Sequence, residues 1–418
     1  MWDALWLNAE LATMAGQEAF GLIADGAVAI EGRHIAWVGS RTALPAAPET
    51  LAKSVHDVDG RLLTPGLIDP HTHVLFAGDG LVDFEVLIAG GGRAEMFAAG
   101  GGVPGMVRQT RGATDEAIYA AGSRRVAELI AAGVTTLESK SGSGLDEDSE
   151  LRLLRLSRQL DRDFPIDVVN TFLGAHGLPP EYAQDQRDAY VDLLCQSILP
   201  KAIAEGLVDQ VDGFCDAMGF SHAQISRQFD IAAAHGLPVK LHADQYTDFA
   251  AGALVARYRG LSADHLEYAS EATVAAMAEA GTVATLLPGA NWTLRDPQKP
   301  PVDLFRRYGL TIALATNNNA VSSPTTSPTM MMNMACHLFG LTTEEALAGF
   351  TTGAARALGI ARDRGSLEVG KRADLVEWRV RRPGELAYRI ADNPCATVVK
   401  DGRVIYRAPS IEIAGRRW

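Results

Sequence analysis

The feature that most constrains the fold is the repeated alternation of strand-like and helix-like segments between residues 65 and 364. Eight strand-like runs stand out, each of which contains apolar residues. They are the run that ends at His73 and those at 134–142, 166–176, 211–219, 238–245, 261–268, 282–290 and 310–319. Continuous apolar strands that alternate with helices are typical of a parallel sheet covered on both faces. Eight such units predict an α/β fold, a closed (β/α)₈ TIM barrel.

Helical patterns separate most of these strands, and several begin at Ser, Thr or Asp, which favour helix N-termini. They lie at 114–132, 146–161, 183–205, 221–236, 248–259, 270–280 and 300–308. The glycine-rich run 90–105 has no dinucleotide-binding fingerprint, and we expect it to be a mobile lid or a backbone lining of a substrate pocket. The methionines at 330–334 lie on a helical stretch, so we expect them to pack in the core.

Both chain ends read as short strands joined by turns. Neither end is long enough to build a robust core alone. We therefore expect residues 1–64 and 365–418 to form one composite β-sandwich domain, and residues 65–364 to form the barrel.

Composition and charge limit the kinds of partner that we expect the protein to bind. The 418 residues carry a formal charge of −13, which disfavours nucleic acid, because that partner needs clustered Lys and Arg. No apolar run approaches the roughly 20 residues of a membrane span, and the first residues lack a secretory signal pattern. The four cysteines have no C-x-x-C spacing and are expected to be buried in a reducing compartment. We expect a cytoplasmic protein that binds a small molecule.

Polar residues gather where the strands of the barrel would end, and this is where such barrels carry their chemistry. Five of the ten histidines fall at four of these ends: His71, His73, His176, His242 and His265. His71 and His73 point to the same face, because side chains alternate along a strand. Neutral imidazole is the commonest metal ligand, and a catalytic zinc usually has three protein ligands. The pattern indicates a metal site at the mouth of the barrel.

The motifs PGLIDPHTH, FLGAH, KLHADQ, SADHLEY and GSLEVGKRADLV occur in this order, and together they resemble the amidohydrolase superfamily. The resemblance implies that His71, His73 and His242 hold one divalent metal, with zinc first and iron second. It places Gln245, His265 and His176 around the metal-bound water and the substrate, and Asn319 against the substrate. The fourth strand lacks the lysine that would bridge two metals, so one ion is implied. Relatives of this kind are commonly homodimers.

The chain departs from the pattern of these relatives at three positions. Asn317 replaces an aspartate that serves as metal ligand and general base, and an amide can still coordinate but cannot accept a proton. Gly80 and Ser143 replace an arginine and a tyrosine that bind the substrate, and the arginine normally holds a carboxylate. Arg93, in the glycine-rich run, is a candidate for supplying the lost charge.

The sequence thus predicts a metal-dependent hydrolase that cleaves a C–N bond of a small cyclic amide or amidine. The bound dication would lower the pKa of a water to about 7, and His265 would move the proton. Ring opening of a substrate with or without a propionate tail stays open. The alternatives are a deaminase that releases ammonia and a catalytically weak ligand-binding paralogue.

Overall fold

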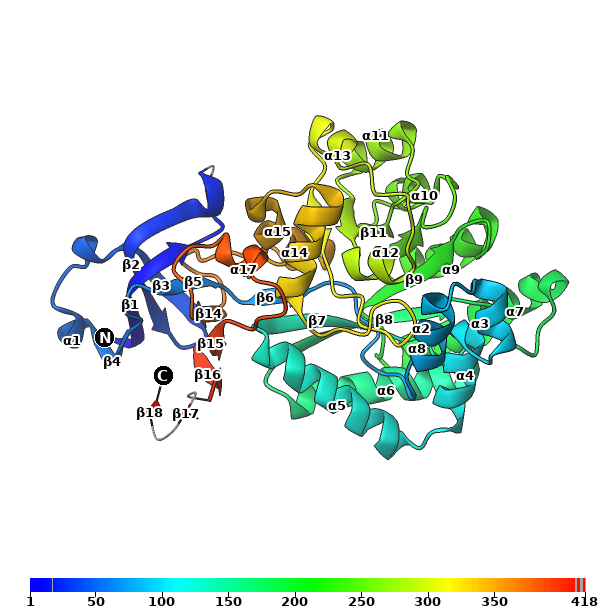
Figure 1. Cartoon of the computed structure of the whole chain (residues 1–418), viewed down its shortest axis with the longest axis horizontal. Helices are drawn as coiled ribbons and strands as arrows, with labels where there is room; N and C mark the ends of the chain where they lie inside the picture. The colour runs from blue at the N-terminus through cyan, green and yellow to red at the C-terminus, as the bar shows by residue number, and fades with distance from the viewer. Residues whose placement is uncertain (17, 410–411, 414–415, 418) are drawn as a thin grey trace.

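The computed structural model describes residues 1–16, 18–409, 412–413 and 416–417. Its larger part is a parallel sheet in which eight strands follow one another in chain order (Figure 1). The strands are β6 (Leu67–Asp69), β7 (Val134–Lys140), β8 (Asp167–Ala175), β9 (Gln210–Cys215), β10 (Lys240–Ala243), β11 (Ser262–His265), β12 (Val283–Leu286) and β13 (Ile312–Leu314). Each lies at or within a predicted strand region, and the TIM-barrel prediction is confirmed.

The first and last strands meet just beyond their C-terminal ends. The backbone N–H of His73 donates to the carbonyl of Asn318 at 2.9 Å, and that of Asn317 donates to the carbonyl of His71 at 3.0 Å. The buried carboxylate of Asp69 accepts from both the backbone N–H and the hydroxyl of Thr316, at 3.1 and 2.6 Å. These bonds close the ring of strands and place Asn317 directly beside His71.

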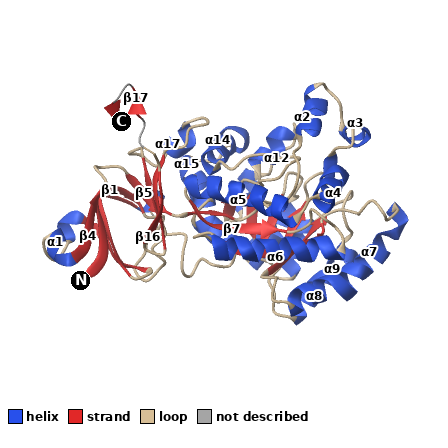
Figure 2. Cartoon of the chain, turned by 90° about the horizontal axis from the view of Figure 1, so that it is seen from below, coloured by secondary structure: helices blue, strands red, loops and turns tan. Residues whose placement is uncertain are grey.

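Helices cover the outside of the barrel, as the sequence predicts (Figure 2). Thr114, Asp146 and Ser221 each accept a hydrogen bond from a backbone N–H of the first turn, which explains where three of these helices begin. The helices are α5 (Asp115–Ala131), α6 (Glu147–Asp163), α7 (Arg187–Leu193), α8 (Leu199–Ala204), α9 (His222–Ala234), α10 (Ala251–Arg257), α11 (Glu271–Ala280), α13 (Val302–Arg307), α14 (Pro328–Phe339), α15 (Thr343–Gly349) and α16 (Thr352–Ala357). Among the described residues, no helix is both long and apolar enough to cross a membrane.

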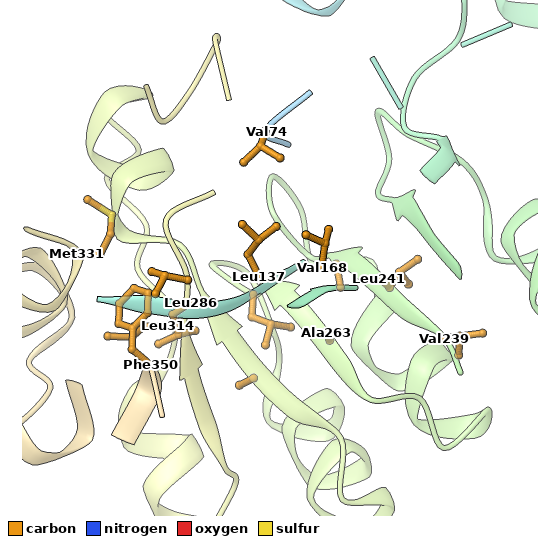
Figure 3. Packing of buried hydrophobic residues seen from close by; sticks show 14 of the residues in the cluster. Val74, Leu137, Val168, Val239, Leu241, Ala263, Leu286, Leu314, Met331 and Phe350 are labelled. Atoms are coloured by element: carbon orange, nitrogen blue, oxygen red, sulfur yellow. The ribbon is translucent and has the colours of Figure 1, made fainter. Parts of the chain in front are cut away.

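The main hydrophobic core lies between the strands and these helices. Leu137, Leu241 and Leu314 project from three different strands into this packing (Figure 3). Met331 and Met332 of α14 are buried in it, as predicted for the methionine run. The core holds the strand ends in fixed positions, which is the condition for a precise site at the barrel mouth.

The two chain ends share a second, mixed sheet of eight strands, which confirms that they combine. Its strands are β1 (Trp2–Ala12), β2 (Leu22–Glu31), β3 (His34–Ser40), β4 (Ala52–Asp57), β5 (Leu62–Pro65), β14 (Leu375–Trp378), β15 (Cys395–Lys400) and β16 (Arg403–Arg407). The antiparallel pairing of β5 with β14 joins the early strands to the late ones. Short elements complete the chain: η1 (Ala19–Gly21), η2 (Arg41–Ala43), α1 (Pro48–Leu51), η3 (Gln184–Gln186), η4 (Leu194–Ile198), α17 (Glu385–Tyr388), β17 (Glu412–Ile413) and β18 (Arg416–Arg417).

Two local expectations differ from the structure. The glycine-rich run is largely helical: after α2 (Leu81–Ile88) come α3 (Arg93–Ala98) and α4 (Gly102–Gly112). Gly90 and Gly100 have φ values of 88° and 86°, so they interrupt the helices at turns. The strand expected at 282–290 ends at Leu286, because Pro288 begins α12 (Pro288–Thr293).

Candidate metal centre and active site

Three histidines meet at the C-terminal mouth of the barrel. His71 and His73 follow β6, and His242 lies in β10. One ring nitrogen from each lies within 4.8 Å of those from the other two, and all three side chains are buried. The structure therefore brings together the three residues that the sequence nominated as metal ligands, in a geometry that can hold a metal ion.

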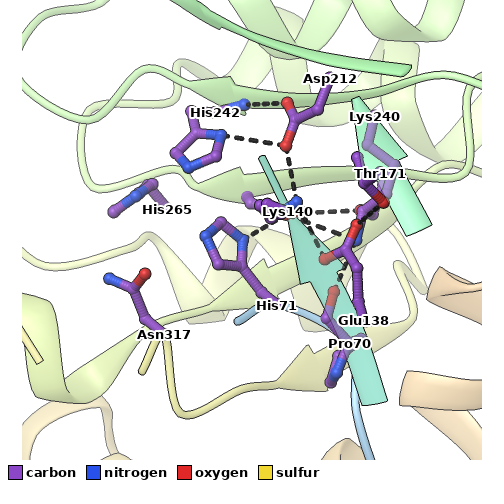
Figure 4. A network of polar contacts seen from close by, with 12 residues as sticks. Pro70, His71, Glu138, Lys140, Thr171, Asp212, Lys240, His242, His265 and Asn317 are labelled. Atoms are coloured by element: carbon purple, nitrogen blue, oxygen red, sulfur yellow. Dashed lines mark hydrogen bonds and ion pairs between the residues drawn. The ribbon is translucent and has the colours of Figure 1, made fainter. Parts of the chain in front are cut away.

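The far sides of two of these rings face buried carboxylates. His71 Nδ1 lies 2.6 Å from Asp264, and His242 Nδ1 lies 3.1 Å from Asp212 (Figure 4). The Nε2 atoms of His71 and His242 are buried and have no hydrogen-bond partner. Buried polar atoms are rarely left unpaired, and metal-binding histidines usually turn their other nitrogen to a carboxylate or carbonyl. The residues present thus fit a metal ion.

The protonation state of the histidine cluster is also compatible with metal binding. Burial lowers the pKa of His71 well below its ordinary value, and the charge of Lys140 lowers it further. Burial likewise lowers the pKa of His73 well below the usual range, with His176 contributing. Both rings are therefore neutral near pH 7, which is the form that coordinates a metal.

Beneath the histidines lies a buried charge network that crosses the inside of the barrel (Figure 4). Lys140 Nζ, at the end of β7, lies 2.6 Å from Asp212 and 2.9 Å from Glu138. Lys240 Nζ, in β10, donates to Glu138 at 3.0 Å and to the Pro70 carbonyl at 2.6 Å. The network therefore ties Asp212, the partner of His242, to the backbone that precedes His71.

The buried network has more negative than positive groups. Three carboxylates, those of Glu138, Asp212 and Asp264, face two ammonium groups, and Lys140 and Lys240 each lie 3.7 Å from Asp264. Burial alone would lower the pKa of Lys140, but the three carboxylates raise it above its ordinary value. One excess negative charge remains in formal terms, and a dication held by the histidines would offset it.

A cavity of about 170 Å³ opens over the cluster. His176 lies at its wall, stacks on His73 with ring centroids 5.2 Å apart, and places Nδ1 2.8 Å from the Gly142 carbonyl. That carbonyl can only accept, so Nδ1 carries the proton and Nε2 is left as an acceptor. Gln245 also lines the cavity.

His265 lines the same cavity, with its ring centroid 5.5 Å from that of His242. His265 and Leu266 have φ values of 81° and 69°, a conformation that is costly for non-glycine residues and that the surrounding structure must hold in place. Behind the ring, Nδ1 lies 3.8 Å from Glu267, and burial raises the pKa of that carboxyl to about 8. His265 is thus held at the mouth of the barrel beside a second titratable group.

Asn317 and Asn319 both line the cavity, but their side chains differ in how firmly hydrogen bonds hold them. The Asn317 side chain points toward His71 and His265 in Figure 4, and its nearest hydrogen-bond partner is Ser322 at 3.5 Å. Asn319 is fully engaged: its amide nitrogen donates to the Asn317 carbonyl at 2.7 Å, and its oxygen accepts from the backbone N–H groups of Val321 and Ser322. Asn319 therefore shapes the turn after β13.

The two positions where the resemblance implies a substrate-binding arginine and tyrosine, Gly80 and Ser143, do not line the cavity. Ser143 is fully buried, and Gly80 packs against the turn after β13: a Cβ added there would lie 1.8 Å from the Ala320 carbonyl oxygen. Arg93 begins α3, and its side chain lies outside the described part of the chain.

Sequence reasoning missed the charge network and most of the cavity wall. A signal for the network was present, because Glu138, Lys140 and Lys240 lie in strands of a sheet that is expected to be covered on both faces, and a buried charge requires a partner. One signal marked part of the wall: the glycine-rich run 90–105 was expected to form a lid or to line a substrate pocket, and Met96, Gly102 and Val103 line the cavity. The rest of the lining comes from segments without a comparable signal: Met106, Phe214, Tyr246, Leu294, Val321 and Ser322.

Comparisons with known proteins show the family of the chain. The model of the amidohydrolase family matches residues 62–405. Imidazolonepropionase from Caulobacter vibrioides is 52% identical over 393 residues, covering 94% of this chain and 97% of that protein. Imidazolonepropionase from Cupriavidus taiwanensis is 50% identical, with 96% and 95% covered.

Solved structures share the fold at low sequence identity. A 5-methylcytosine deaminase from Klebsiella pneumoniae aligns with a TM-score of 0.75 at 18% identity, with 98% of each chain covered. Atrazine chlorohydrolase from Arthrobacter aurescens, complexed with zinc, aligns with a TM-score of 0.72 at 17% identity, covering 97% of this chain and 95% of that one. With the family model spanning most of the sequence and full-length relatives about half identical, this chain belongs to the amidohydrolase family.

Proposed function

We propose that this protein hydrolyses the ring C–N bond of a small cyclic amide of the imidazolone type, with one divalent metal ion. The observation that carries the proposal is the buried cluster of His71, His73 and His242 beneath the cavity, in a chain about half identical to imidazolonepropionases. In such a reaction one water adds to the ring carbonyl carbon and the C–N bond breaks. The products are a carboxylate and an N–H group on one open chain, and no ammonia is released.

The three histidines would hold the ion, with Asn317 as a neutral fourth neighbour. Zinc is the first expectation and iron the second, because three imidazoles with an open position are typical of catalytic zinc. Bound there, the ion would acidify a water and polarise the ring carbonyl.

The proton must be moved by a histidine. Gln245 and Asn317 carry amides, which do not accept a proton near pH 7, whereas His265 lines the cavity with an imidazole. We assign to His265 the transfer of a proton from water to the leaving ring nitrogen. His176 Nε2 is free to accept a hydrogen bond from a substrate N–H, since its Nδ1 is used by the Gly142 carbonyl.

The test is turnover by purified protein loaded with zinc or iron, followed by loss of imidazolone absorbance and by an ammonia assay. We expect imidazolones to open without ammonia, a chelator to abolish turnover, and metal to restore it. His265→Gln should reduce kcat by about 100-fold or more, while His222→Gln, on the outer helix α9, should not. Release of ammonia, or absence of turnover on every ring tested, would contradict the proposal.

The expected homodimer stays a prediction. Light scattering of the metal-loaded protein measures it directly: a mass of twice 44.5 kDa is expected, and a mass of 44.5 kDa would show that the expectation is wrong.

A further inference from the structure

The residues that line the cavity above the histidines are of two chemical kinds. The polar floor carries the imidazoles and the amides of Gln245 and Asn317. Most of the remaining lining, which we call the wall, is apolar and comes from α3, α4, β9 and the segments after α12 and β13: Met96, Val103, Met106, Phe214, Leu294 and Val321. A substrate whose ring carbonyl reaches the floor must place its substituents near this wall.

No Lys or Arg side chain lines the cavity in the part of the chain that the structure describes. Three cationic residues on neighbouring segments bind other acceptors and do not line the cavity. Arg108 donates to the Gly100 carbonyl at 2.7 Å, Arg295 donates to the Leu87 carbonyl, and Lys299 is bound to Asn291. A carboxylate placed against the wall would have no charged partner there, and burying an unpaired carboxylate is costly.

The turn after β13 also leaves no space for a long side chain at Gly80. A Cβ there would lie 1.8 Å from the Ala320 oxygen and 2.8 Å from the Ala320 carbonyl carbon, both backbone atoms. Ala320 is in turn packed with Phe76 and Met106 in a small buried cluster. Admitting a side chain at position 80 would therefore require this turn to move, so position 80 cannot supply a charged group to the site without a rearrangement of the backbone.

From these observations we propose that the substrate carries an uncharged, apolar ring substituent where imidazolonepropionate carries a carboxylate. This inference rests on the proposed function for the reaction itself and adds the class of substrate. The apolar wall would bind an alkyl or similar group by burying it, and would disfavour an anionic tail.

A pair of unreactive probes tests the specificity without relying on turnover. 4-Propylimidazole and imidazole-4-propionate share the ring that meets the floor and differ in the charge of the tail. By calorimetry on the metal-loaded protein, the propyl compound is expected to bind at least about 10-fold more tightly. Equal affinity, or tighter binding of the propionate, would overturn the inference.

Engineering the wall provides the second test. Val321→Lys places an ammonium group at the cavity and should raise affinity for the propionate probe at least about 10-fold, while the uncharged control Val321→Met should leave the preference for propyl in place. Arg93→Gln should leave both affinities unchanged. A large loss of propionate binding on Arg93→Gln would show that Arg93 supplies a carboxylate site, and the inference would be wrong.

Turnover separates the two proposals. 5-Propylimidazolone and imidazolonepropionate are compared as substrates, and kcat/KM is expected to be at least about 10-fold higher for the propyl compound. Preferred opening of the propionate compound would overturn the specificity and leave ring hydrolysis intact. If neither ring opens while the propyl probe still binds more tightly, the proposed function fails and the apolar specificity stands.

Discussion

The Nδ1 atom of His71 lies 2.6 Å from a carboxylate oxygen of Asp264, and both side chains are fully buried. The carboxylate fixes the proton on Nδ1 and turns Nε2 toward the other histidines. Asp264 Oδ1 is itself held by the Ser262 hydroxyl at 2.6 Å. The orientation of the ligand thus depends on residues that never touch the metal.

Removal of this carboxylate should weaken metal binding. Asp264→Asn keeps the shape but loses the charge, so we expect metal affinity to fall about 10- to 100-fold, as measured by competition with a chromophoric chelator. Asp374→Asn is the matched control, because Asp374 is a buried carboxylate of the terminal sheet, paired with Lys400 and remote from the histidines. Equal metal affinity in Asp264→Asn and the unmodified protein would argue against the positioning role.

Lys140 should be critical for stability. It is fully buried among three carboxylates, and Lys140→Met would leave them facing one ammonium group. We expect the free energy of unfolding to fall by about 3–5 kcal/mol in urea titrations, the usual cost of breaking a buried ion pair. Lys53→Met, which removes an exposed pair with Asp3, should lower the free energy of unfolding far less, because solvent screens an exposed pair. Similar losses in the two variants would be inconsistent with a tightly coupled network.

The fold could be predicted because the alternation of strand-like and helix-like segments repeats along the sequence. Eight apolar strands alternating with capped helices leave few arrangements of this size, and the histidines fall at strand ends where a barrel concentrates chemistry. Helices α3 and α4 were missed because the glycines around them read as a loop, although Gly90 and Gly100 only terminate helical turns.

The site was predictable only in part, for a physical reason. His71 and His73 share one motif, so their proximity follows from strand geometry alone. The contact of Lys140 with Asp212 and the approach of Ala320 to Gly80 join residues tens to hundreds of positions apart. Such contacts depend on side-chain packing across the barrel, which no local pattern encodes.

Asn317 offers a direct test of the resemblance to amidohydrolases, which implies an aspartate at this position. Asn317→Asp places a carboxylate in the cavity beside the histidines, and we expect metal affinity to rise at least about 10-fold, because a carboxylate is a stronger ligand than an amide and adds opposite charge. Asn318→Asp is the control, since the Asn318 amide donates to the Thr325 carbonyl and does not line the cavity. An equal gain in both variants would indicate a general charge effect.

Glu267 should make the protein less stable as pH rises. Burial raises the pKa of its carboxyl from 4.5 to about 8, so between these values the folded protein holds a proton that the unfolded chain has lost. Stability from this group is therefore complete below about pH 4.5 and falls with a slope of up to about 1.4 kcal/mol per pH unit until about pH 8.

Glu267→Gln removes this titration and keeps the shape of the side chain. The difference in free energy of unfolding between Glu267→Gln and the unmodified protein, from urea titrations of metal-loaded samples, should grow in favour of the variant from pH 5 to pH 8. Taking the difference cancels the other groups that titrate over this range, including the histidines of the metal site. A difference that stays constant with pH would mean that Glu267 is already ionised at pH 5 in the folded protein, and that the carboxylate beside His265 carries its charge throughout the working range.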